Sequence, residues 1–170
     1  MKKKSSLFFL LIGLFLVFLL TAARPVGEHN KLHCYALIGP IEKNGNGSSR
    51  IIKKECFANF ADSIRAATNG RVQLNSSTQP ETVTDEILNF SSGEVSPSSQ
   101  VVIGIDWDNT NFGGSSYTWV VSGSGCSSST QYSVSSMPSG WDNRVSSARG
   151  YSNCNYFYHY QNTSYGGTSV

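Results

Sequence analysis

The order of hydrophobic and polar positions predicts two strands and one helix in the first half of the chain. Residues 32–38, with the sequence LHCYALI, are apolar enough for a strand, and residues 50–56, RIIKKEC, suit its partner. The intervening KNGNGSS at 43–49 contains Asn-Gly pairs, which readily take the positive φ angles of a hairpin turn. Beyond it, apolar positions at helical spacing predict a short helix that is capped by Asn59 and ends at Asn69-Gly70.

The pattern changes in the second half of the chain, which has no helical period. Residues 91–99, SSGEVSPSS, are polar and rich in Ser, Pro and Gly, which predicts a flexible linker. After it the chain is rich in Gly, Ser, Tyr, Trp and Asn, a composition typical of short strands with many turns. We therefore expect a small α+β region at 24–90, made of a hairpin and a helix, the linker at 91–99, and an all-β domain at 100–170.

The first 23 residues have the pattern of a secretory signal peptide. A lysine cluster precedes an apolar run from Leu7 to Leu20, and small residues follow at Thr21-Ala22-Ala23. The run is short for a helix that spans a bilayer, which needs about 20 apolar residues. We predict that residues 1–23 are removed and that the mature protein is secreted, with no membrane partner; an uncleaved anchor is the alternative.

The net charge of the chain depends on this N-terminal segment. The whole sequence has 13 Lys+Arg and 11 Asp+Glu, and removal of Lys2, Lys3 and Lys4 leaves 10 basic residues against 11 acidic ones. The mature chain is then close to neutral and has no basic stripe, so we expect no nucleic-acid partner.

Four cysteines remain after the predicted cleavage site: Cys34, Cys56, Cys126 and Cys154. An even number in an exported protein indicates disulfides, and four cysteines allow three connectivities. Proximity in the sequence favours Cys34–Cys56 and Cys126–Cys154, one bridge in each half of the chain. A zinc–thiolate site is the competing interpretation, but no pair has the C-x-x-C spacing that brings two thiolates to one ion.

A nine-residue pattern occurs twice in the second half. WDNTNFGGS at 107–115 is matched by YQNTSYGGT at 160–168, and both copies read aromatic-x4-aromatic-x-Gly. The two aromatic rings can pack across a folded-over hairpin, while the glycine takes a backbone conformation closed to other residues. The residues of the two motifs are Trp107, Phe112, Gly114, Tyr160, Tyr165 and Gly167.

This repeat resembles the motif of the βγ-crystallin superfamily, whose secreted bacterial members include crystallin-like metalloproteinase inhibitors. The resemblance covers about 70 residues and implies an all-β Greek-key sandwich, in which each motif forms four strands and two motifs make a domain. The second motif has sequence for only about two strands before Val170, so we expect it to be incomplete. Its open edge could pair with another copy of the chain, be covered by the N-terminal half, or leave an unstable fragment.

The residues from Asp142 to Ser147, DNRVSS, match the calcium signature of that family. The resemblance implies that calcium is held by the side chains of Asp142, Asn143 and Ser146 and by the carbonyl of Arg144, while Ser147 braces the turn. Groups from the loop Gln161–Ser164 would complete the site. These are oxygen ligands, as Ca²⁺ prefers, although one carboxylate compensates its charge weakly. A turn of Asx and Ser type without metal is the alternative.

Catalytic machinery is not evident from the spacing of residues. The motifs G-x-S-x-G and H-E-x-x-H are absent, and His29, His33 and His159 are isolated, so we do not expect an enzyme. The sequence instead favours a secreted, calcium-binding module with a structural or binding role. Inhibition of extracellular metalloproteases through the loop Ser122–Thr130 is one alternative, since a loop tethered by Cys126 would be rigid.

A second alternative is an antimicrobial or cell-surface glycan-binding role. Several aromatic residues could form a platform for sugars, although we interpret them as core and hairpin residues. They are Trp107, Trp119, Trp141, Tyr156, Phe157, Tyr158 and Tyr160.

Overall fold

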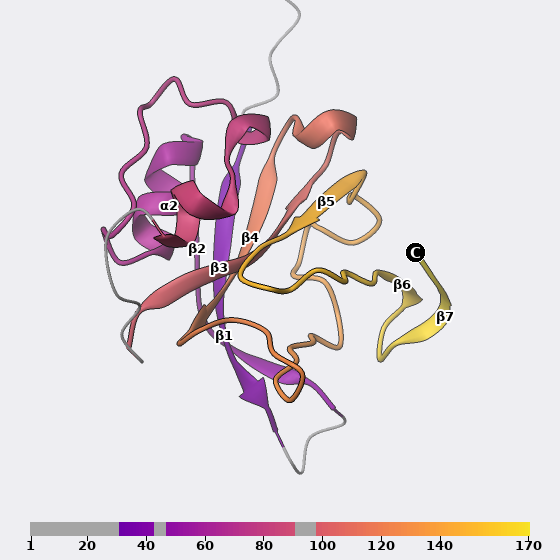
Figure 1. The fold of residues 1–170 in the computed structure, drawn as a ribbon. Helices are drawn as coiled ribbons and strands as arrows, with labels where there is room; N and C mark the ends of the chain where they lie inside the picture. The colour runs from indigo at the N-terminus through magenta and orange to yellow at the C-terminus, as the bar shows by residue number, and fades with distance from the viewer. Residues whose placement is uncertain (1–30, 43–46, 91–97) are drawn as a thin grey trace, which may run out of the picture. The chain divides into compact units, whose positions relative to one another are not determined.

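The computed structural model describes residues 31–42, 47–90 and 98–170 (Figure 1). The predicted signal peptide at 1–23, part of the predicted hairpin turn and most of the predicted linker lie outside these residues. Within the described ranges, no helix is long and apolar enough to cross a membrane.

A five-stranded sheet in the order β2-β1-β4-β3-β5 forms the centre of the structure. Neighbouring strands are antiparallel except for β1 and β4, which are parallel. A separate two-stranded sheet, β6-β7, lies near the C-terminus (Figure 1). The strands are β1 (His33–Ile41), β2 (Ser49–Phe57), β3 (Gln100–Trp107), β4 (Ser116–Ser122), β5 (Ser147–Gly150), β6 (Tyr160–Asn162) and β7 (Gly166–Ser169). The structure is therefore mostly β, as predicted.

The two regions predicted from the sequence share this one sheet. The N-terminal hairpin β1-β2 joins the C-terminal strands through the β1–β4 pairing, and residues 31–170 form one compact unit. This differs from the expected separation of residues 24–90 from 100–170. The physical reason is the burial of β1 on both faces: Ala36 packs on one side of the sheet and Leu37 on the other. A strand that is apolar on both faces needs neighbours along both edges and cover on both sides.

Helix α2 spans Phe60–Ala67, where the apolar spacing predicted a helix. The side chain of Asn59 caps it by accepting a hydrogen bond from the Ala61 amide, 2.8 Å away. Its inward face, which includes Phe60 and Ile64, packs against one face of the sheet. Three short turns complete the helical structure: the 3₁₀ turns η1 (Pro80–Thr82) and η3 (Thr110–Phe112), and the π-helical turn η2 (Glu86–Phe90).

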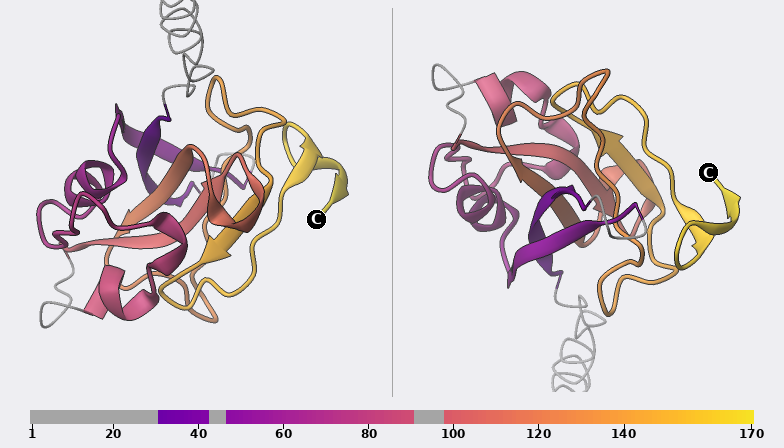
Figure 2. Two further views of the ribbon diagram at one scale, coloured as in Figure 1. Left: turned by 90° about the horizontal axis from the view of Figure 1, so that it is seen from above. Right: turned by 90° about the horizontal axis from the view of Figure 1, so that it is seen from below.

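The two faces of the sheet are covered in different ways (Figure 2). Helix α2 and turn η2 cover one face, where Ile105 and Trp107 of β3 are completely buried. Irregular segments between residues 123 and 160 cover the other face, where Ile103 and Trp119 belong to a second core. A bulge in β3 at Ile103, where the register with β4 shifts, changes which residues face each side.

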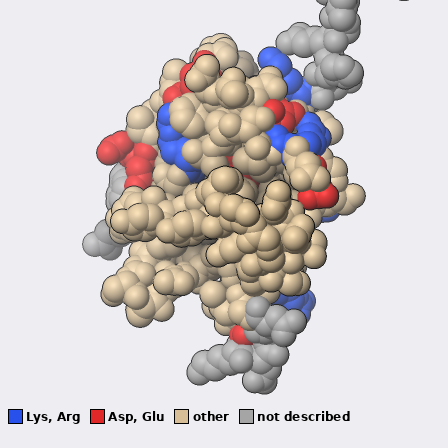
Figure 3. All heavy atoms as spheres, turned by 90° about the vertical axis from the view of Figure 1, so that its right-hand side faces the viewer, with Lys and Arg blue, Asp and Glu red and all other residues tan. Residues whose placement is uncertain are grey.

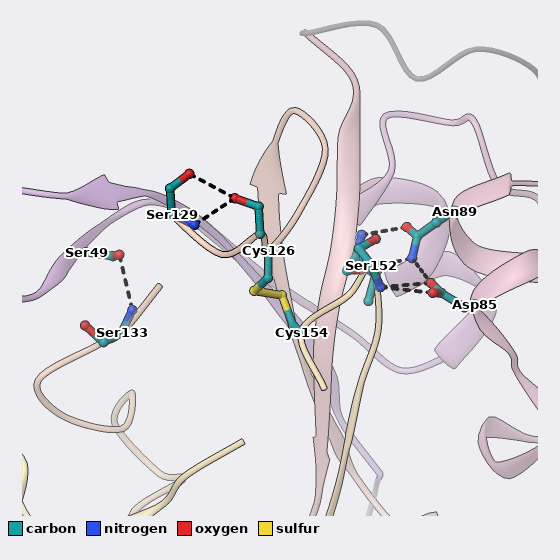
Figure 4. Close-up of a disulfide and its surroundings, with 10 residues drawn as sticks. Ser49, Asp85, Asn89, Cys126, Ser129, Ser133, Ser152 and Cys154 are labelled. Atoms are coloured by element: carbon teal, nitrogen blue, oxygen red, sulfur yellow. Dashed lines mark hydrogen bonds between the residues drawn. A yellow bond between two sulfur atoms is a disulfide. The ribbon is translucent and has the colours of Figure 1, made fainter. Parts of the chain in front are cut away.

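Both predicted disulfides are confirmed. Cys34–Cys56 joins the neighbouring strands β1 and β2, whereas Cys126–Cys154 joins the loop after β4 to the segment after β5 (Figure 4). The second bridge therefore ties down a part of the chain that has little regular secondary structure.

The buried side-chain amide of Asn89 links β3 to the segment after β5, close to the second disulfide (Figure 4). The side chain of Asn89 is 2% exposed, and it accepts a hydrogen bond from the Val102 amide and donates one to the Val102 carbonyl, both at 3.0 Å. It also donates to Asp85, whose carboxylate accepts from the Ser152 amide. Asn89 of η2 therefore pairs with the backbone of Val102 as a neighbouring strand would, next to the bulge in β3. Through Asp85, it also holds Ser152 at the start of the C-terminal segment.

We predict that the variant Cys126→Ser/Cys154→Ser loses roughly 3 kcal/mol of unfolding free energy, because the bridge closes a loop whose ends are 28 residues apart. Urea denaturation followed by tryptophan fluorescence measures this loss. Limited proteolysis should in addition show new cleavage between residues 123 and 165.

The matched variant Cys34→Ser/Cys56→Ser removes a bridge of similar span, 22 residues, between strands that are already paired. We expect a comparable loss of stability but no new cleavage between residues 123 and 165. Identical cleavage patterns in the two variants would contradict the assigned role of the Cys126–Cys154 bridge.

Candidate functional site

The two copies of the sequence repeat form hairpins with the same ring geometry. Trp107 and Phe112 pack edge to face, with ring centroids 5.0 Å apart and an interplanar angle of 65°. Tyr160 and Tyr165 do the same at 5.7 Å and 77°. The repeat is therefore structural as well as sequential.

The backbones of the two hairpins also match. Three residues in each copy have positive φ: 57°, 60° and 81° at Asn111, Phe112 and Gly114, and 56°, 61° and 76° at Ser164, Tyr165 and Gly167. The glycine position is also closed by close packing, since a Cβ on Gly114 would lie 2.1 Å from an Asp108 oxygen. Positive φ at the second aromatic residue was not predicted, because bulky residues rarely adopt it.

The turn Asp142–Ser147 braces the first hairpin. The hydroxyl of Ser146 donates to the Asp108 carbonyl at 2.9 Å. The hydroxyl of Ser147 donates to the Asn109 carbonyl at 2.7 Å and accepts from the Phe112 amide at 3.1 Å. Both serines thus contact the hairpin backbone, including Ser146, which the sequence analysis assigned to calcium.

The side chains of Asp142 and Asn143 point toward solvent, whereas Val145 is partly buried and packs against the core. Asp142 and Asn143 are exposed, and the Asn143 amide is 3.4 Å from an Asp142 carboxylate oxygen. The guanidinium of Arg144 donates to the Gly140 carbonyl at 2.9 Å and forms an ion pair with Asp108. The guanidinium is therefore held by the first hairpin and by the residues before the turn. Among the residues that the structure describes, no group of three or more His, Cys, Asp or Glu side chains could hold a metal ion.

A groove of about 1170 Å³ lies on the face of the sheet opposite α2. Ile38, Ile103 and Trp119 line its floor. Its walls are the segment 132–137 and the segment 153–162. The walls carry mainly Tyr, Ser and Asn side chains, so the groove combines an apolar floor with neutral hydrogen-bonding groups.

A buried carboxylate attaches the C-terminal segment to this face. Asp106 on β3 is completely buried, and its Oδ2 accepts a hydrogen bond from the Trp119 indole at 2.8 Å. The Nε2 atom of His159 lies 3.1 Å from Oδ1, and the two form an ion pair when the imidazole is protonated. The contact with Asp106 raises the pKa of His159, and burial opposes the rise only in part.

Exposure alternates along the C-terminal segment. Phe157 and His159 face inward, and Phe157 packs so closely on Gly104 that a Cβ there would lie 2.1 Å from the ring. Tyr156, Tyr158 and Tyr160 face outward, with 82%, 63% and 44% of their surface exposed. This alternation with a period of two is that of an extended backbone.

The aromatic residues therefore divide into two groups. Trp107, Trp119 and Trp141 are core residues, in agreement with the sequence-based interpretation. Tyr156 and Tyr158 are not, because they belong to neither the core nor the hairpin ring pairs. The exposure of these two tyrosines is missed from sequence pattern alone, since an aromatic residue in a strand usually packs against its neighbours. The alternation of Tyr with Phe157 and His159 was the available signal.

The predicted inhibitor loop is held at its base and exposed at its tip. The Cys126 amide donates to the Ser152 carbonyl at 3.0 Å, and backbone hydrogen bonds join Ser127 and Thr130. The exposed tip consists of serines, which lack the large anchoring side chains typical of tight protein interfaces. Inhibition of proteases stays a prediction.

The other described histidine lies in the core. His33 Nδ1 shares a hydrogen bond of 2.9 Å with the Ser116 hydroxyl, and the ring packs on Phe60. Burial, aided by the nearby charge of Lys31, lowers the pKa of His33 to about 4. His29 lies outside the described residues.

Comparison with protein-family models, with curated proteins and with solved structures finds no match for this chain.

The pKa shifts of the two described histidines predict opposite dependences of stability on pH. The raised pKa of His159 means that its contribution is fully present below about pH 6.5 and is lost as pH rises through the folded-state value. The lowered pKa of His33 means that its contribution is present above pH 6.5 and is lost as pH falls toward 4.

We therefore expect His159→Gln to cost more unfolding free energy at pH 5.5 than at pH 9, and His33→Gln to cost more at pH 8 than at pH 4.5. Urea denaturation of the wild type and both variants across this range provides the measurement. If either variant runs parallel to the wild type at every pH, the corresponding assignment is wrong.

Proposed function

We propose that the chain is a noncatalytic, extracellular binding module of the βγ-crystallin type. The observation that carries the proposal is the pair of matching hairpins, each with an edge-to-face ring pair and the same series of positive φ angles. Aromatic-glycine hairpins are the element by which the sequence resembles that superfamily. The two disulfides support an extracellular setting, since such bridges persist in oxidising environments.

The order of strands in the main sheet is compatible with this proposal. A Greek key places its fourth strand beside the first, in the spatial order 4-1-2-3. The adjacent antiparallel strands β5, β3 and β4 follow the order 4-1-2. The strand next to β4 is β1 of the N-terminal hairpin, which pairs with it in parallel and so differs from the antiparallel third strand of a Greek key. On this view the N-terminal hairpin extends the module rather than forming a domain of its own.

A noncatalytic role is supported by the surroundings of the titratable groups in the core. The described histidines are engaged with Ser116 and Asp106, and neither contact places a nucleophile beside a base at an open surface. General acid–base chemistry requires a proton-transfer group within hydrogen-bond reach of the substrate.

Calcium binding belongs to the proposal as a weak, stabilising interaction at the turn Asp142–Ser147. The Asp142 carboxylate, the Asn143 amide oxygen and the Arg144 carbonyl are oxygen donors, and Ser146 donates its proton to Asp108 while its own lone pairs stay available. A bound Ca²⁺ would supply positive charge that fixes these oxygens. The turn offers only one carboxylate to compensate the charge of the ion, so we expect the millimolar affinity of extracellular modules.

We predict that 10 mM CaCl₂ raises the melting temperature of the protein by about 3–5 °C, because binding at tenfold the dissociation constant adds about 1.4 kcal/mol to the folded state. Differential scanning calorimetry, with MgCl₂ at equal ionic strength as reference, measures the shift.

The variant Asp142→Asn should lose the calcium shift, because it removes the only carboxylate of the turn. The control Asp62→Asn alters an exposed carboxylate on helix α2 and should keep it. The calcium proposal fails if Asp142→Asn responds as strongly as the wild type, or if calorimetric titration of the wild type detects no binding.

A further inference from the structure

An exposed row of three tyrosines is the surface feature that neither the core nor the disulfides explain. Tyr156, Tyr158 and Tyr160 face outward from one extended segment, and they are the largest exposed aromatic side chains that the described residues contain. Alternate residues of an extended chain are about 6.6 Å apart, so the row is about 13 Å long. Large apolar rings held in water at this density indicate a binding surface.

The row is held rigidly, although the segment has little regular secondary structure. The Cys126–Cys154 disulfide fixes its start, the Phe157 ring rests on Gly104, and His159 contacts the buried Asp106. The three outward rings are therefore oriented before any ligand arrives. Preorganisation of this kind lowers the entropic cost of binding.

The β6-β7 hairpin fixes the far end of the row. The Ser164 amide donates to the Ser135 carbonyl at 2.7 Å. The Tyr165 hydroxyl contacts the Gly47 carbonyl at 3.2 Å and the Ser133 hydroxyl at 3.0 Å. These contacts attach the hairpin to the opposite wall of the groove, so the row and the groove form one continuous surface.

The tyrosine row carries no formal charge and is rich in hydrogen-bonding groups, while the carboxylates of Asp106 and Asp142 border the groove beside it. The sequence from Tyr151 to Val170 contains no Asp, Glu, Lys or Arg. On the side of the molecule where the C-terminal residues lie, charged side chains gather toward the upper part and the lower edge, and uncharged residues dominate between them (Figure 3). The side chains of Asn155, Gln161 and Asn162 flank the tyrosines and border the groove.

These properties select one class of ligand. A nucleic acid or an anionic polymer would require basic side chains, which this surface lacks. An apolar peptide or acyl chain would be matched by Leu, Met or Phe rather than by tyrosines flanked by amides. A neutral sugar chain offers C–H faces that pack on the negative face of an aromatic ring, and hydroxyls that pair with amide and phenol groups.

We propose that the row Tyr156-Tyr158-Tyr160, with the adjoining groove, binds a neutral polysaccharide through stacking of sugar rings on the tyrosines. The inference rests on the proposed function of a binding module and names its ligand. It does not depend on calcium.

The test is binding of the purified protein to neutral polysaccharides. Depletion from solution by cellulose and by chitin, together with calorimetric titration with cellohexaose and chitohexaose, covers insoluble and soluble forms. Alginate and heparin serve as anionic comparators. We expect binding to at least one neutral polymer, little change between 50 mM and 500 mM NaCl, and no binding to the anionic polymers.

Variants locate the site. Tyr158→Ala should weaken binding about tenfold and the triple alanine variant should abolish it, whereas Tyr158→Phe should stay within about threefold, because it keeps the ring. Ile52→Ala, an equally exposed apolar residue on β2, should bind like the wild type. Tyr158 is exposed and belongs to no hairpin ring pair, so its two variants should keep the melting temperature of the wild type, whereas the triple variant also loses the Tyr160–Tyr165 ring pair and is compared with Tyr160→Ala alone.

A measurement on the wild-type protein locates the site without any substitution, so it does not depend on how well the variants fold. Nitration by tetranitromethane, mapped by mass spectrometry, should modify Tyr156 and Tyr158 in the free protein and be suppressed by the bound oligosaccharide. The absence of binding to every neutral polymer overturns the inference, and so does binding that is lost in 500 mM NaCl.

Self-association is the other outcome that overturns it. If sedimentation shows a dimer that the triple alanine variant dissociates, the row is an interface between copies of this chain. If the protein binds no glycan but calcium still raises its melting temperature, the glycan inference is wrong, while the proposed binding module stands and must have another ligand. Glycan binding without a calcium shift would instead remove only the calcium part of the proposed function.

Discussion

The buried carboxylate of Asp106 is the constraint on which the arrangement of the C-terminal residues depends. Removing a carboxylate from water is costly unless hydrogen-bonding or oppositely charged groups meet it. The Trp119 indole satisfies only one of the two oxygens, and the other faces the ring of His159 at 3.1 Å. The segment that carries His159 must therefore cross this face of the sheet. Because its backbone is extended, the neighbours of His159 at positions 158 and 160 then face solvent.

Local features of the fold could be predicted from the sequence because each depends on residues close together in the chain. Asn59 caps helix α2, and the two disulfides join the cysteines nearest in sequence. The parallel pairing of β1 with β4 could not be predicted, since it joins residues more than 80 positions apart and has no turn to specify it. The sequence also gives no signal for the bulge at Ile103. Strict alternation along β3 without the bulge would assign the residues on one side of it to the wrong face of the sheet.

For the candidate site, the sequence identified the residue types but not their surroundings. The serines of the turn Asp142–Ser147 were assigned separate roles, yet both contact the backbone of the first hairpin, because a folded-over hairpin leaves carbonyl groups that need donors. The second hairpin has different partners, because it donates to the walls of the groove: the Ser164 amide to the Ser135 carbonyl and the Tyr165 hydroxyl to the Gly47 carbonyl. Identical local motifs thus have different partners, which only the tertiary structure determines.

The two proposals concern one groove but depend on different physical terms. Asp142 and Asn143 border the same groove as Gln161 and Asn162, so a cation at the turn and a polymer on the tyrosine row would be neighbours. Calcium affinity depends on the charge of Asp142, and salt screens that charge. Stacking on Tyr156 and Tyr158 depends on ring area and on a backbone fixed by Gly104 and Cys154, and salt hardly affects it. Raising the ionic strength should therefore weaken calcium binding but not sugar stacking, even where the two ligands are neighbours in the groove.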